Sequence, residues 1–494
     1  MADEKDENKG PATPSTAWEY MAPKWAMINT ILAGTHAMRL AAQTYLPQHT
    51  GENHGNYDER LKTATLLNML ELTLDTLVGK PFSEPLRLNG DVPAEISAIA
   101  NDIDMQGNSI HSFCRAWFHQ GFAKAFAHCY IDVPAPQTEP GAKRTKADDR
   151  FEGRRPFWSL IAPENVIFML SDMEGGKEVL THVRILETDI SLSGWVEEVK
   201  LRVRVLTPGA WELWELVEKK DKKGKPTGKK EWKKIDSGDS GINVIPIVTF
   251  YATERDRPGL AKPPLEDLAY LNVRHWQSSS DQNNILTVAR FPILAVAGIN
   301  DQAAEQVVVG PRTLLSTKNE QGRYYYVEHT GAAIAQGWHD LADLENQMTN
   351  YGAEFLRKSP GNQTATARAL NSAEATSPLQ DSAYRFLESV TAALDLTARW
   401  LGINSGKGGT AEFTADLKPD PNEAAVFAAI MDSFKEGAID AEEVREEFRR
   451  WNVLNDKTRV VARSGVQSAT VVSAQAKKTA VEKLAAKQGG VNAS

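Results

Sequence analysis

Cysteine is scarce in this sequence. Its 494 residues contain only two cysteines, Cys114 and Cys129, fifteen positions apart within one stretch of helical apolar periodicity. A continuous helix would separate them by about 22 Å along its axis, which is too far for a disulfide bond. The sequence therefore predicts two free thiols. It also excludes a metal framework built on cysteine and fits a reducing compartment.

Long apolar runs are missing as well. No stretch reaches the roughly 18 apolar residues that a transmembrane helix needs. The opening MADEKDENKGPATPST is polar and acidic and lacks the apolar segment of a secretory signal. We therefore predict that residues 1–16 are disordered and that the protein stays in the cytoplasm of the host cell.

The motifs of common enzymes are absent too. A phosphate-binding loop is excluded because only three residues separate Gly402 from Gly406 and because Lys407 is followed by glycine. The sequence has neither a nucleophile elbow nor a His-Glu-Xaa-Xaa-His zinc pair. Two pairs of aspartates are interpreted as turn or cap residues, Asp102 with Asp104 and Asp236 with Asp239. We predict a protein that is not an enzyme and needs no cofactor.

The overall composition is that of an ordinary globular protein. Hydrophobic residues make up 41% of the chain and charged residues 24%, and the length favours two to four domains. The formal net charge of −9 argues against a surface that grips nucleic acid everywhere, because phosphate affinity comes from lysine and arginine. It does not exclude contact with DNA.

Basic residues gather in two places. Residues 219–234 hold nine lysines in sixteen positions, and the neighbouring strand patterns predict a hairpin tip there. A solvated hairpin is favoured over a nucleic-acid patch. The tail from Lys457 has seven lysines and arginines against one glutamate. It could contact DNA or be weakly ordered, and the sequence leaves both open.

The spacing of apolar residues predicts the helices and strands. Apolar residues at helical spacing predict helices at 57–78 and at 110–129, the second capped by Asn108 or Ser109. Period-two patterns predict strands between Tyr130 and Tyr251. The second helix carries His111, Cys114, His119, His128 and Cys129, but a metal site is disfavoured because the cysteines fall on the buried stripe and His111 and His119 on another face.

The most informative stretch is 264–401. It reads as a helix, a β-rich excursion of four short strands, a second helix, a Ser-Pro-Gly break, and a third helix that begins at Ser377-Pro378. This order predicts a rod, a small sheet, and a returning rod. Such a hairpin suits a structural subunit that lines a passage better than it suits an enzyme.

Several short motifs occur in a characteristic order around this hairpin. They are YLP at 45–47, YDERLKTATLLN at 57–68, LVGKPF at 77–82, DIDMQGNSIHSF at 102–113, APENV at 162–166 and TATAR at 364–368. In this order the chain resembles phage portal proteins, the ring subunits at the one capsid vertex through which double-stranded DNA enters and leaves. It is most similar to a portal subfamily known only as an uncharacterised domain.

The resemblance implies a mixed α+β, helix-dominated fold. The implied parts are a disordered N-terminus (1–16), a wing (17–260), a first stem helix (261–290), a β-rich clip (291–337), a second stem helix (338–358), a tunnel loop (359–371), a long wing helix and strand (372–420), crown helices (421–456), and a basic, weakly ordered tail (457–494).

The resemblance also implies a function that is geometric. Copies would form a ring, usually of about twelve, at the capsid vertex of the virion, and DNA would pass without sequence-specific contacts. The implied partners are the terminase large subunit, a head-tail adaptor protein, the major capsid protein and a scaffold, with no membrane. The residues that would face DNA are Arg357, Lys358, Asn362, Gln363, Thr364 and Arg368.

Other interpretations stay open at this stage. Arg357 and Lys358 could simply favour a helix C-terminus. A minor head or adaptor protein of the virion is an alternative, although it would lack the long helical hairpin. A DNA-processing enzyme with an unrecognised metal site is a further alternative, and it would need clustered acidic residues.

Overall fold

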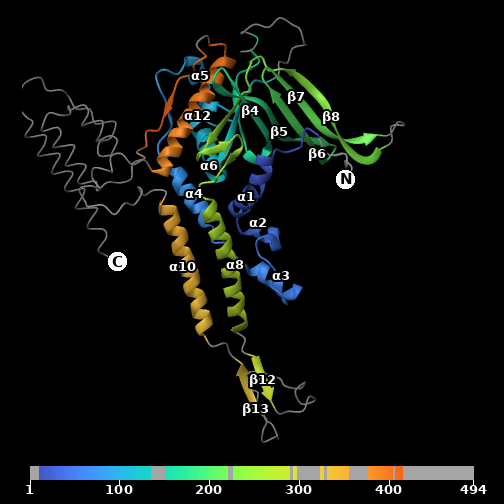
Figure 1. Cartoon of the computed structure of the whole chain (residues 1–494), viewed down its shortest axis with the longest axis vertical. Coiled ribbons are helices and arrows are strands. Elements are labelled where there is room, and N and C mark those ends of the chain that lie inside the picture. The colour runs from blue at the N-terminus through green and yellow to red at the C-terminus, as the bar shows by residue number, and fades with distance from the viewer. Residues whose placement is uncertain are drawn as a thin grey trace, which may run out of the picture. The chain divides into compact units, whose positions relative to one another are not determined.

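The structure is a computed structural model, and it describes residues 10–134, 148, 151–220, 226–289, 293–297, 323–327, 331–354, 377–403 and 406–415. The chain divides into two compact units, Met1–Pro421 and Asn422–Ser494, and every described residue belongs to the first. Within the described ranges this unit mixes helices with antiparallel sheets (Figure 1). No described helix is long and apolar enough to cross a bilayer.

The helices vary from single turns to rods of more than twenty residues. They are α1 (Thr16–Leu32), α2 (Gly34–Ala41), η1 (Ala42–Thr44), α3 (His54–Thr63), α4 (Met69–Gly79), α5 (Ala94–Ile99), η2 (Ala100–Asp102), α6 (Ile110–Lys124), η3 (Pro163–Asn165), α8 (Glu266–Ala289), α10 (Ala332–Glu354) and α12 (Pro378–Trp400).

The strands form a three-stranded sheet in the order β3-β2-β9, a five-stranded sheet in the order β4-β5-β6-β7-β8, and three two-stranded pairs, β1-β14, β10-β11 and β12-β13. Their bounds are β1 (Arg87–Leu88), β2 (Phe126–Asp132), β3 (Phe157–Ile161), β4 (Val166–Glu174), β5 (Lys177–Ser193), β6 (Val196–Thr207), β7 (Ala210–Lys220), β8 (Pro226–Asp239), β9 (Ile247–Tyr251), β10 (Arg255–Arg257), β11 (Leu260–Ala261), β12 (Ile293–Ala297), β13 (Arg323–Val327) and β14 (Ala411–Glu412).

Helix α6 lies at the centre of the main hydrophobic core. Ser109 caps it by accepting a hydrogen bond from the backbone N–H of Ser112, as the sequence predicts. The helix packs against β2 and β9, and α12 packs on the same two strands. Gly121 permits the close approach, because a Cβ at that position would lie 2.4 Å from Cδ1 of Phe250. Phe386 of α12 fills the core with its ring 4.9 Å from that of Phe250.

The prediction of one helix over residues 110–129 is wrong in its last turn. The helix ends at Lys124, and Ala125 has a φ of +81°, so the chain reverses and continues as β2. Cys129 therefore lies on a strand beside α6, and the predicted 22 Å separation from Cys114 does not apply. Both cysteines are free and buried. Burial, and then the nearby Cys114, raises the pKa of the Cys129 thiol.

The predicted helix over 57–78 is in fact two helices. Helix α3 ends at Thr63, and α4 begins at Met69 with Asn68 as its cap. The intervening residues carry backbone groups that bond elsewhere: the Ala64 carbonyl accepts two hydrogen bonds from Arg39, and the Leu66 N–H donates to Thr35. These outside partners replace the helical bonds that periodicity alone predicts.

The five-stranded sheet is an antiparallel meander. The lysine-rich segment 219–234 was predicted as a loop, but strand β8 begins at Pro226 and pairs with β7, so its second half is strand. The predicted hairpin itself is correct. The prediction of disorder for residues 1–16 is wrong from Gly10 onward, because the Ser15 N–H donates to the Ile167 carbonyl and Arg184 donates to the Thr13 carbonyl.

Helix α12 follows the sequence prediction closely. Ser377 accepts a hydrogen bond from the Gln380 N–H, Pro378 occupies the first turn, and the helix runs to Trp400. The strand expected within 372–420 is β14, which covers two residues and pairs with β1. The crown helices expected at 421–456 lie outside the described residues.

The core contains one histidine whose titration gives a testable pH dependence. His128 on β2 is fully buried, and its Nδ1 lies 2.9 Å from Oγ1 of Thr249. Burial lowers the pKa of His128 from 6.5 to about 3. The unfolded chain takes up a proton below pH 6.5 and the folded chain does not, so stability falls as the pH falls through this range.

We expect this residue to remove about 2 kcal/mol of stability between pH 7 and pH 5. A His128→Gln variant keeps a polar partner for Thr249 but cannot titrate, so its loss over the same range should be smaller by that amount. Urea unfolding of both proteins at the two pH values measures the difference. Equal losses in the two proteins would contradict the assignment.

Candidate functional site: a rooted pair of antiparallel helices

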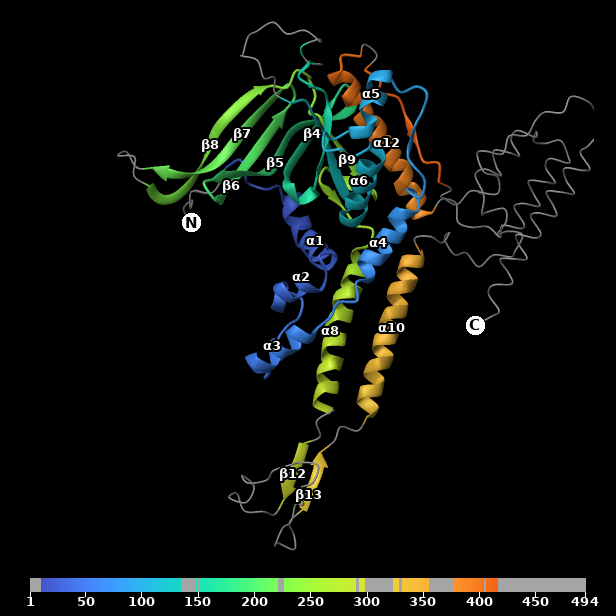
Figure 2. The same cartoon turned by 180° about the vertical axis from the view of Figure 1, so that it is seen from behind.

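Two long helices, α8 and α10, lie side by side (Figure 2). The hydroxyl of Tyr351 donates to the Pro264 carbonyl at 3.3 Å, and Gln282 Nε2 donates to the Ile334 carbonyl at 2.8 Å. Because the last turn of α10 meets the start of α8, and the first turn of α10 meets its far half, the helices are antiparallel. Two polar contacts lie between these ends: Arg274 pairs with Asp340, and Nε2 of His275 lies 3.3 Å from Oε1 of Glu345.

Between the helices in the chain lie strands β12 and β13, which pair in register from Ile293↔Val327 to Ala297↔Arg323. These are the first and last of the four short strands predicted there. The other two lie outside the described residues. The predicted start of the second helix at 338 is late, because α10 begins at Ala332. The β-rich stretch, expected to reach 337, is therefore shorter at that end.

Helix α10 contacts the rest of the protein along a narrow stripe. Leu341, Leu344 and Met348 are its buried apolar residues, at the spacing of one helix face. Two glycines allow close approach: a Cβ on Gly337 would lie 2.1 Å from Oε1 of Gln282, and one on Gly352 would lie 2.9 Å from Cγ2 of Thr73 on α4. Most of the remaining side chains of α10 that the structure describes are exposed.

The base of α8 is fixed by a buried asparagine. Asn272 has no exposed surface. Its side-chain oxygen accepts a hydrogen bond from the Leu70 N–H at 3.0 Å, and its amide nitrogen donates to the Leu67 carbonyl at 2.8 Å. The Leu70 N–H is one of the amides that the first turn of α4 leaves without a helical partner, and Leu67 directly precedes the Asn68 cap. One side chain thus joins α8 to the start of α4 across about two hundred residues of sequence.

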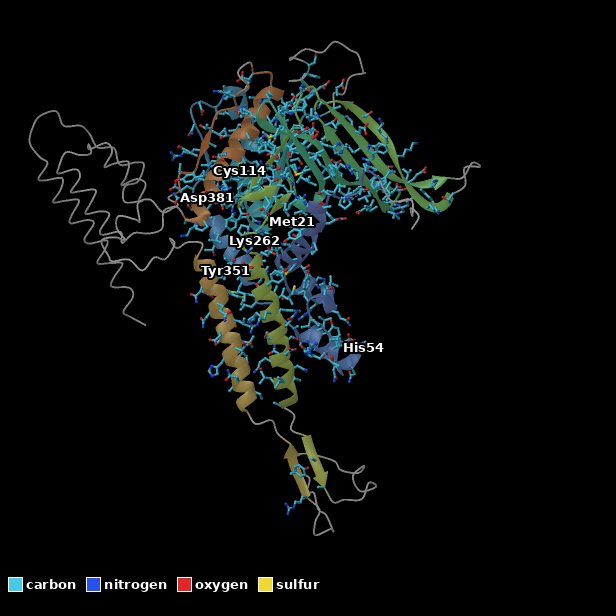
Figure 3. The ribbon with its side chains drawn as sticks, in the orientation of Figure 1. Met21, His54, Cys114, Lys262, Tyr351 and Asp381 are labelled. Carbon is cyan, nitrogen blue, oxygen red and sulfur yellow. The ribbon has the colours of Figure 1, made fainter. Side chains whose placement is uncertain are left out.

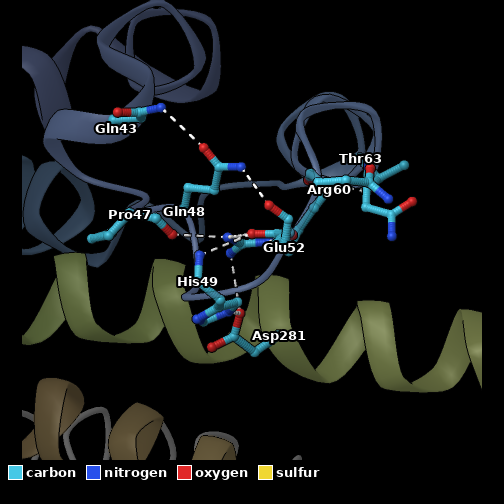
Figure 4. Close-up of polar contacts among 10 residues, drawn as sticks. Gln43, Pro47, Gln48, His49, Glu52, Arg60, Thr63 and Asp281 are labelled. Atoms are coloured by element: carbon cyan, nitrogen blue, oxygen red, sulfur yellow. Dashed lines mark hydrogen bonds and ion pairs between the residues drawn. The ribbon is translucent and has the colours of Figure 1, made fainter.

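Farther along α8, Arg60 makes a second buried joint (Figure 4). The Arg60 side chain is 1% exposed. Its Nε and Nη2 donate to the two carboxylate oxygens of Glu52, each at 2.9 Å, and Nη1 donates to Asp281 at 3.1 Å. The Pro47 carbonyl accepts a further bond from Nη2 at 2.8 Å, and His49 Nε2 lies 3.0 Å from Asp281. The segment before α3 is thereby attached to α8.

The electrostatics follow from these contacts. The hydrogen bond from Arg60 lowers the pKa of Glu52. Burial opposes the charged form of Arg60, but its hydrogen bond to Glu52 and the nearby charges of Glu52 and Asp281 outweigh this and raise its pKa. Glu52 and Arg60 therefore stay ionised near neutral pH. The site is a charge cluster that fixes geometry.

The upper end of the helix pair is held by polar contacts as well. Asp267 accepts a bond from Lys262 at 2.9 Å and lies 3.4 Å from the hydroxyl of Tyr351. Lys262 and Tyr351 are labelled in Figure 3 where the helices meet the rest of the unit. A neighbouring joint connects α1, α6 and η3: Glu164 accepts bonds from Lys124 at 2.6 Å and from Asn29 at 3.1 Å.

The motifs that the sequence singled out supply these joints. YLP contributes the Pro47 carbonyl, the 57–68 motif contributes Arg60, and APENV contributes Glu164. In DIDMQGNSIHSF, Asp104 accepts hydrogen bonds from the Gln106 and Asn108 N–H groups, which confirms the turn interpretation for that residue. Sequence reasoning missed Arg60, Asn272 and Gln282 as individual residues, because their partners lie far away along the chain.

The DNA-facing residues that the resemblance implies cannot be placed. Arg357, Lys358, Asn362, Gln363, Thr364 and Arg368 all lie outside the described residues, and their role stays a prediction.

Three of the described histidines lie in separate local contacts. No group of three or more His, Cys, Asp or Glu side chains that could hold a metal occurs in the part of the chain that the structure describes. His111 accepts a hydrogen bond from the Leu86 N–H, His119 lies 3.7 Å from Asp75, and His128 faces Thr249. Each is thus engaged in its own contact.

A cavity of about 640 Å³ lies beside the three-stranded and five-stranded sheets, lined by Tyr130, Asp132, Trp211 and Trp400 among others. Burial raises the pKa of Asp132. Two arginines line this cavity: Arg204 is paired with Glu187, and Arg154 donates to the Pro134 carbonyl. The hydroxyl of Ser240, also in the lining, donates to the Ile242 carbonyl.

Comparison with known proteins gives one family match. A family model described as a domain of unknown function, DUF4055, matches residues 264–401. The match spans α8, the β12-β13 pair, α10 and α12. No curated protein matches the sequence significantly.

Among solved structures, the chain is similar to chains of gene transfer agent particles. One comes from the neck of an empty particle computed with C6 symmetry, with 13% identity and a TM-score of 0.36. The second comes from the virion of a native particle, with 13% identity and a TM-score of 0.35. The third comes from the neck of a native particle computed with C12 symmetry, with 11% identity and a TM-score of 0.35. Each alignment covers 82% of this chain and 97% of the other.

The Arg60 joint gives a stability prediction. An Arg60→Met variant leaves Glu52 and Asp281 without their cation, and breaking a buried pair in this way costs about 3–5 kcal/mol. Lys62→Met is the matched control, because Lys62 is exposed and contacts only Glu59, and it should leave stability unchanged. Urea unfolding measures both. Hydrogen exchange should rise in α8 and in 47–52 for Arg60→Met alone, and similar behaviour of the two variants would refute the joint.

The close packing at Gly337 gives a second prediction. Gly337→Ala forces the Gln282 amide away from the Ile334 carbonyl, and an unpaired buried amide should destabilise the fold by about 1–3 kcal/mol. In a Gln282→Ala background the same change should be neutral or stabilising by up to about 1 kcal/mol, because alanine favours a helix over glycine. Urea unfolding of the wild type, the two single variants and the double variant completes this double-mutant cycle. The same cost in both backgrounds would show that the two residues are not coupled.

Proposed function

We propose that this chain is a portal subunit, copies of which form a ring at one capsid vertex through which double-stranded DNA is packaged and ejected. The observation that carries the proposal is the antiparallel pair α8 and α10, joined through a β-pair and rooted by buried polar contacts. In a ring, the helix pairs of successive subunits would stand side by side and together enclose a passage. The family resemblance of the ordered motifs supports the same function.

The rooting of the helices fits this role. A wall that surrounds a moving polymer must hold its shape, and loosely packed helices do not. Asn272 and Arg60 hold α8 through hydrogen bonds that have specific directions, whereas apolar contacts alone would let it slide. Such joints give geometric specificity.

The charge of the helix pair also supports a passage for DNA. Between Ala332 and Glu354 the sequence has no lysine or arginine, and Asp340, Asp343 and Glu345 are exposed. Helix α8 carries one arginine against three carboxylates. Phosphate groups are not attracted to such a surface. DNA would therefore move past it without being held.

The remaining parts of the function are proposals of the same kind. The segment 359–371 would face DNA as a tunnel loop, with Arg357, Lys358 and Arg368 near phosphates and Asn362, Gln363 and Thr364 as neutral polar contacts. The terminase large subunit and then a head-tail adaptor would dock on the β-rich tip. The major capsid protein and a scaffold would surround the wing.

Two competing functions make different demands. A DNA-processing enzyme would need acidic residues gathered around a metal, and the described residues hold no such group. A minor head or adaptor protein would not need two rods of more than twenty residues each. The helix pair therefore favours the portal ring.

The test is negative-stain electron microscopy of the purified full-length protein, combined with mass photometry. We expect rings of about twelve copies with a central hole that admits B-form DNA, whose diameter is about 20 Å. An Arg357→Ala/Lys358→Ala variant should form the same rings and change only DNA retention in packaging assays. A small closed oligomer without a hole, or metal-dependent cleavage of DNA, would contradict the proposed function.

A further inference from the structure

The five-stranded sheet divides into two separate hairpins at its outer end. Pairing between β6 and β7 stops at Arg202↔Glu215. Pairing within β5-β6 continues to Ser193↔Val196, and pairing within β7-β8 continues to Lys220↔Pro226. Beyond that point the two hairpins have no ladder between them, and Figure 1 shows their arrangement in the sheet.

The end of the β5-β6 hairpin is apolar and exposed. Gly194, with a φ of +65°, opens a two-residue turn that holds Trp195 outward. Five exposed apolar residues gather here, and we name them the hydrophobic tip: Ile190, Leu192, Trp195, Val196 and Val199. Trp195 is fully exposed, and the other four are between 60% and 76% exposed. Exposed apolar clusters of this kind mark protein interfaces.

The hydrophobic tip also carries negative charge. Glu197 and Glu198 lie between Val196 and Val199 and are exposed. Glu198 lies 4.0 Å from Lys200, and Glu197 has no ion pair among the described residues. A partner surface should therefore offer positive charge.

The other hairpin presents the complementary charge. Strand β8 is the outer strand of the sheet. Its Lys229, Lys230 and Lys233 are exposed and form no ion pair with any described residue, whereas Lys234 is paired with Glu212 at 3.3 Å. We name Lys229, Lys230 and Lys233 the lysine edge.

We propose that the hydrophobic tip of one copy docks on the lysine edge of the next copy. Opposite uncompensated charges on one chain, at two different hairpins, favour a second copy of this chain as the occupant. Because the two surfaces are different, they can join head to tail, and the contact then repeats from copy to copy and closes a ring or extends a filament, whereas reciprocal pairing would give a two-fold dimer. The inference rests on the proposed ring and identifies one contact that would close it.

Charge reversal tests this contact without disturbing the core. A tip variant, Glu197→Lys/Glu198→Lys, would bring lysines against lysines, and an edge variant, Lys230→Glu/Lys233→Glu, would bring glutamates against glutamates. Each alone should weaken self-association by at least about tenfold. In an equal mixture every junction again joins opposite charges, so association should return. The change Asp172→Lys/Glu174→Lys, on β4 beside the start of β5, is the matched control and should associate as the wild type does.

Mass photometry and sedimentation velocity of the full chain measure association, and circular dichroism checks that each variant folds. A further variant, Trp195→Ser, should weaken association and should not be rescued by mixing with the edge variant. Normal association of either charge variant, failure of the mixture to recover, or a wild type that stays monomeric would overturn the proposal. Electron microscopy distinguishes failure of this contact from failure of the proposed function. Rings formed by the tip variant would refute the contact between the hydrophobic tip and the lysine edge and leave the proposed function standing.

Discussion

The structure depends on one constraint, which is that a polar group taken out of water must find a partner. Asn272 and Arg60 meet it by bonding to residues about two hundred positions away in the chain, Asn272 to both Leu67 and Leu70 and Arg60 to Asp281. Neither joint can form until α8 lies in its native position against α3 and α4. If α8 slid by one residue, buried donors and acceptors would lose their partners. The polar contacts therefore fix the position of α8 along α3 and α4, and the burial of apolar side chains supplies most of the stabilising free energy.

The ordered motifs of the sequence belong to this framework. Pro47 and Arg60 meet at α8, Glu164 joins three elements around Lys124, and Asp104 closes a tight turn before α6. None of them forms a nucleophile, a base or a metal site in the described residues. A chain whose distinctive residues hold its elements in place is suited to a role that depends on shape.

Much of the secondary structure could be predicted from periodicity and caps. Ser377-Pro378 predicted the start of α12, and the two rods and the outer two strands between them were expected from residues 264–358. The helix predicted over 110–129 failed because apolar residues continue through Phe126 into a strand that is buried on both faces, and periodicity does not detect the reversal at Ala125. The helix over 57–78 failed because Arg39 and Thr35 bond its middle from another element. The joints at Asn272 and Gln282 could not be predicted, since their partners become neighbours only in the fold, and the expected DNA-facing residues lie outside the described part of the chain.

The position of the anchors on α8 has a mechanical consequence. The helix is about 36 Å long, and its hydrogen bonds to residues earlier in the chain lie between Glu266 and Asp281. Beyond Asp281, Gln282 bonds to α10, so the two helices together extend past the first helices as a cantilever. A push along the axis would load the two hydrogen bonds of Asn272 in shear and pass into α3 and α4. Lys24 of α1 takes part of the same load through its bond to Glu266. The first helices of the chain thus act as the mount that bears force arriving from the β12-β13 end.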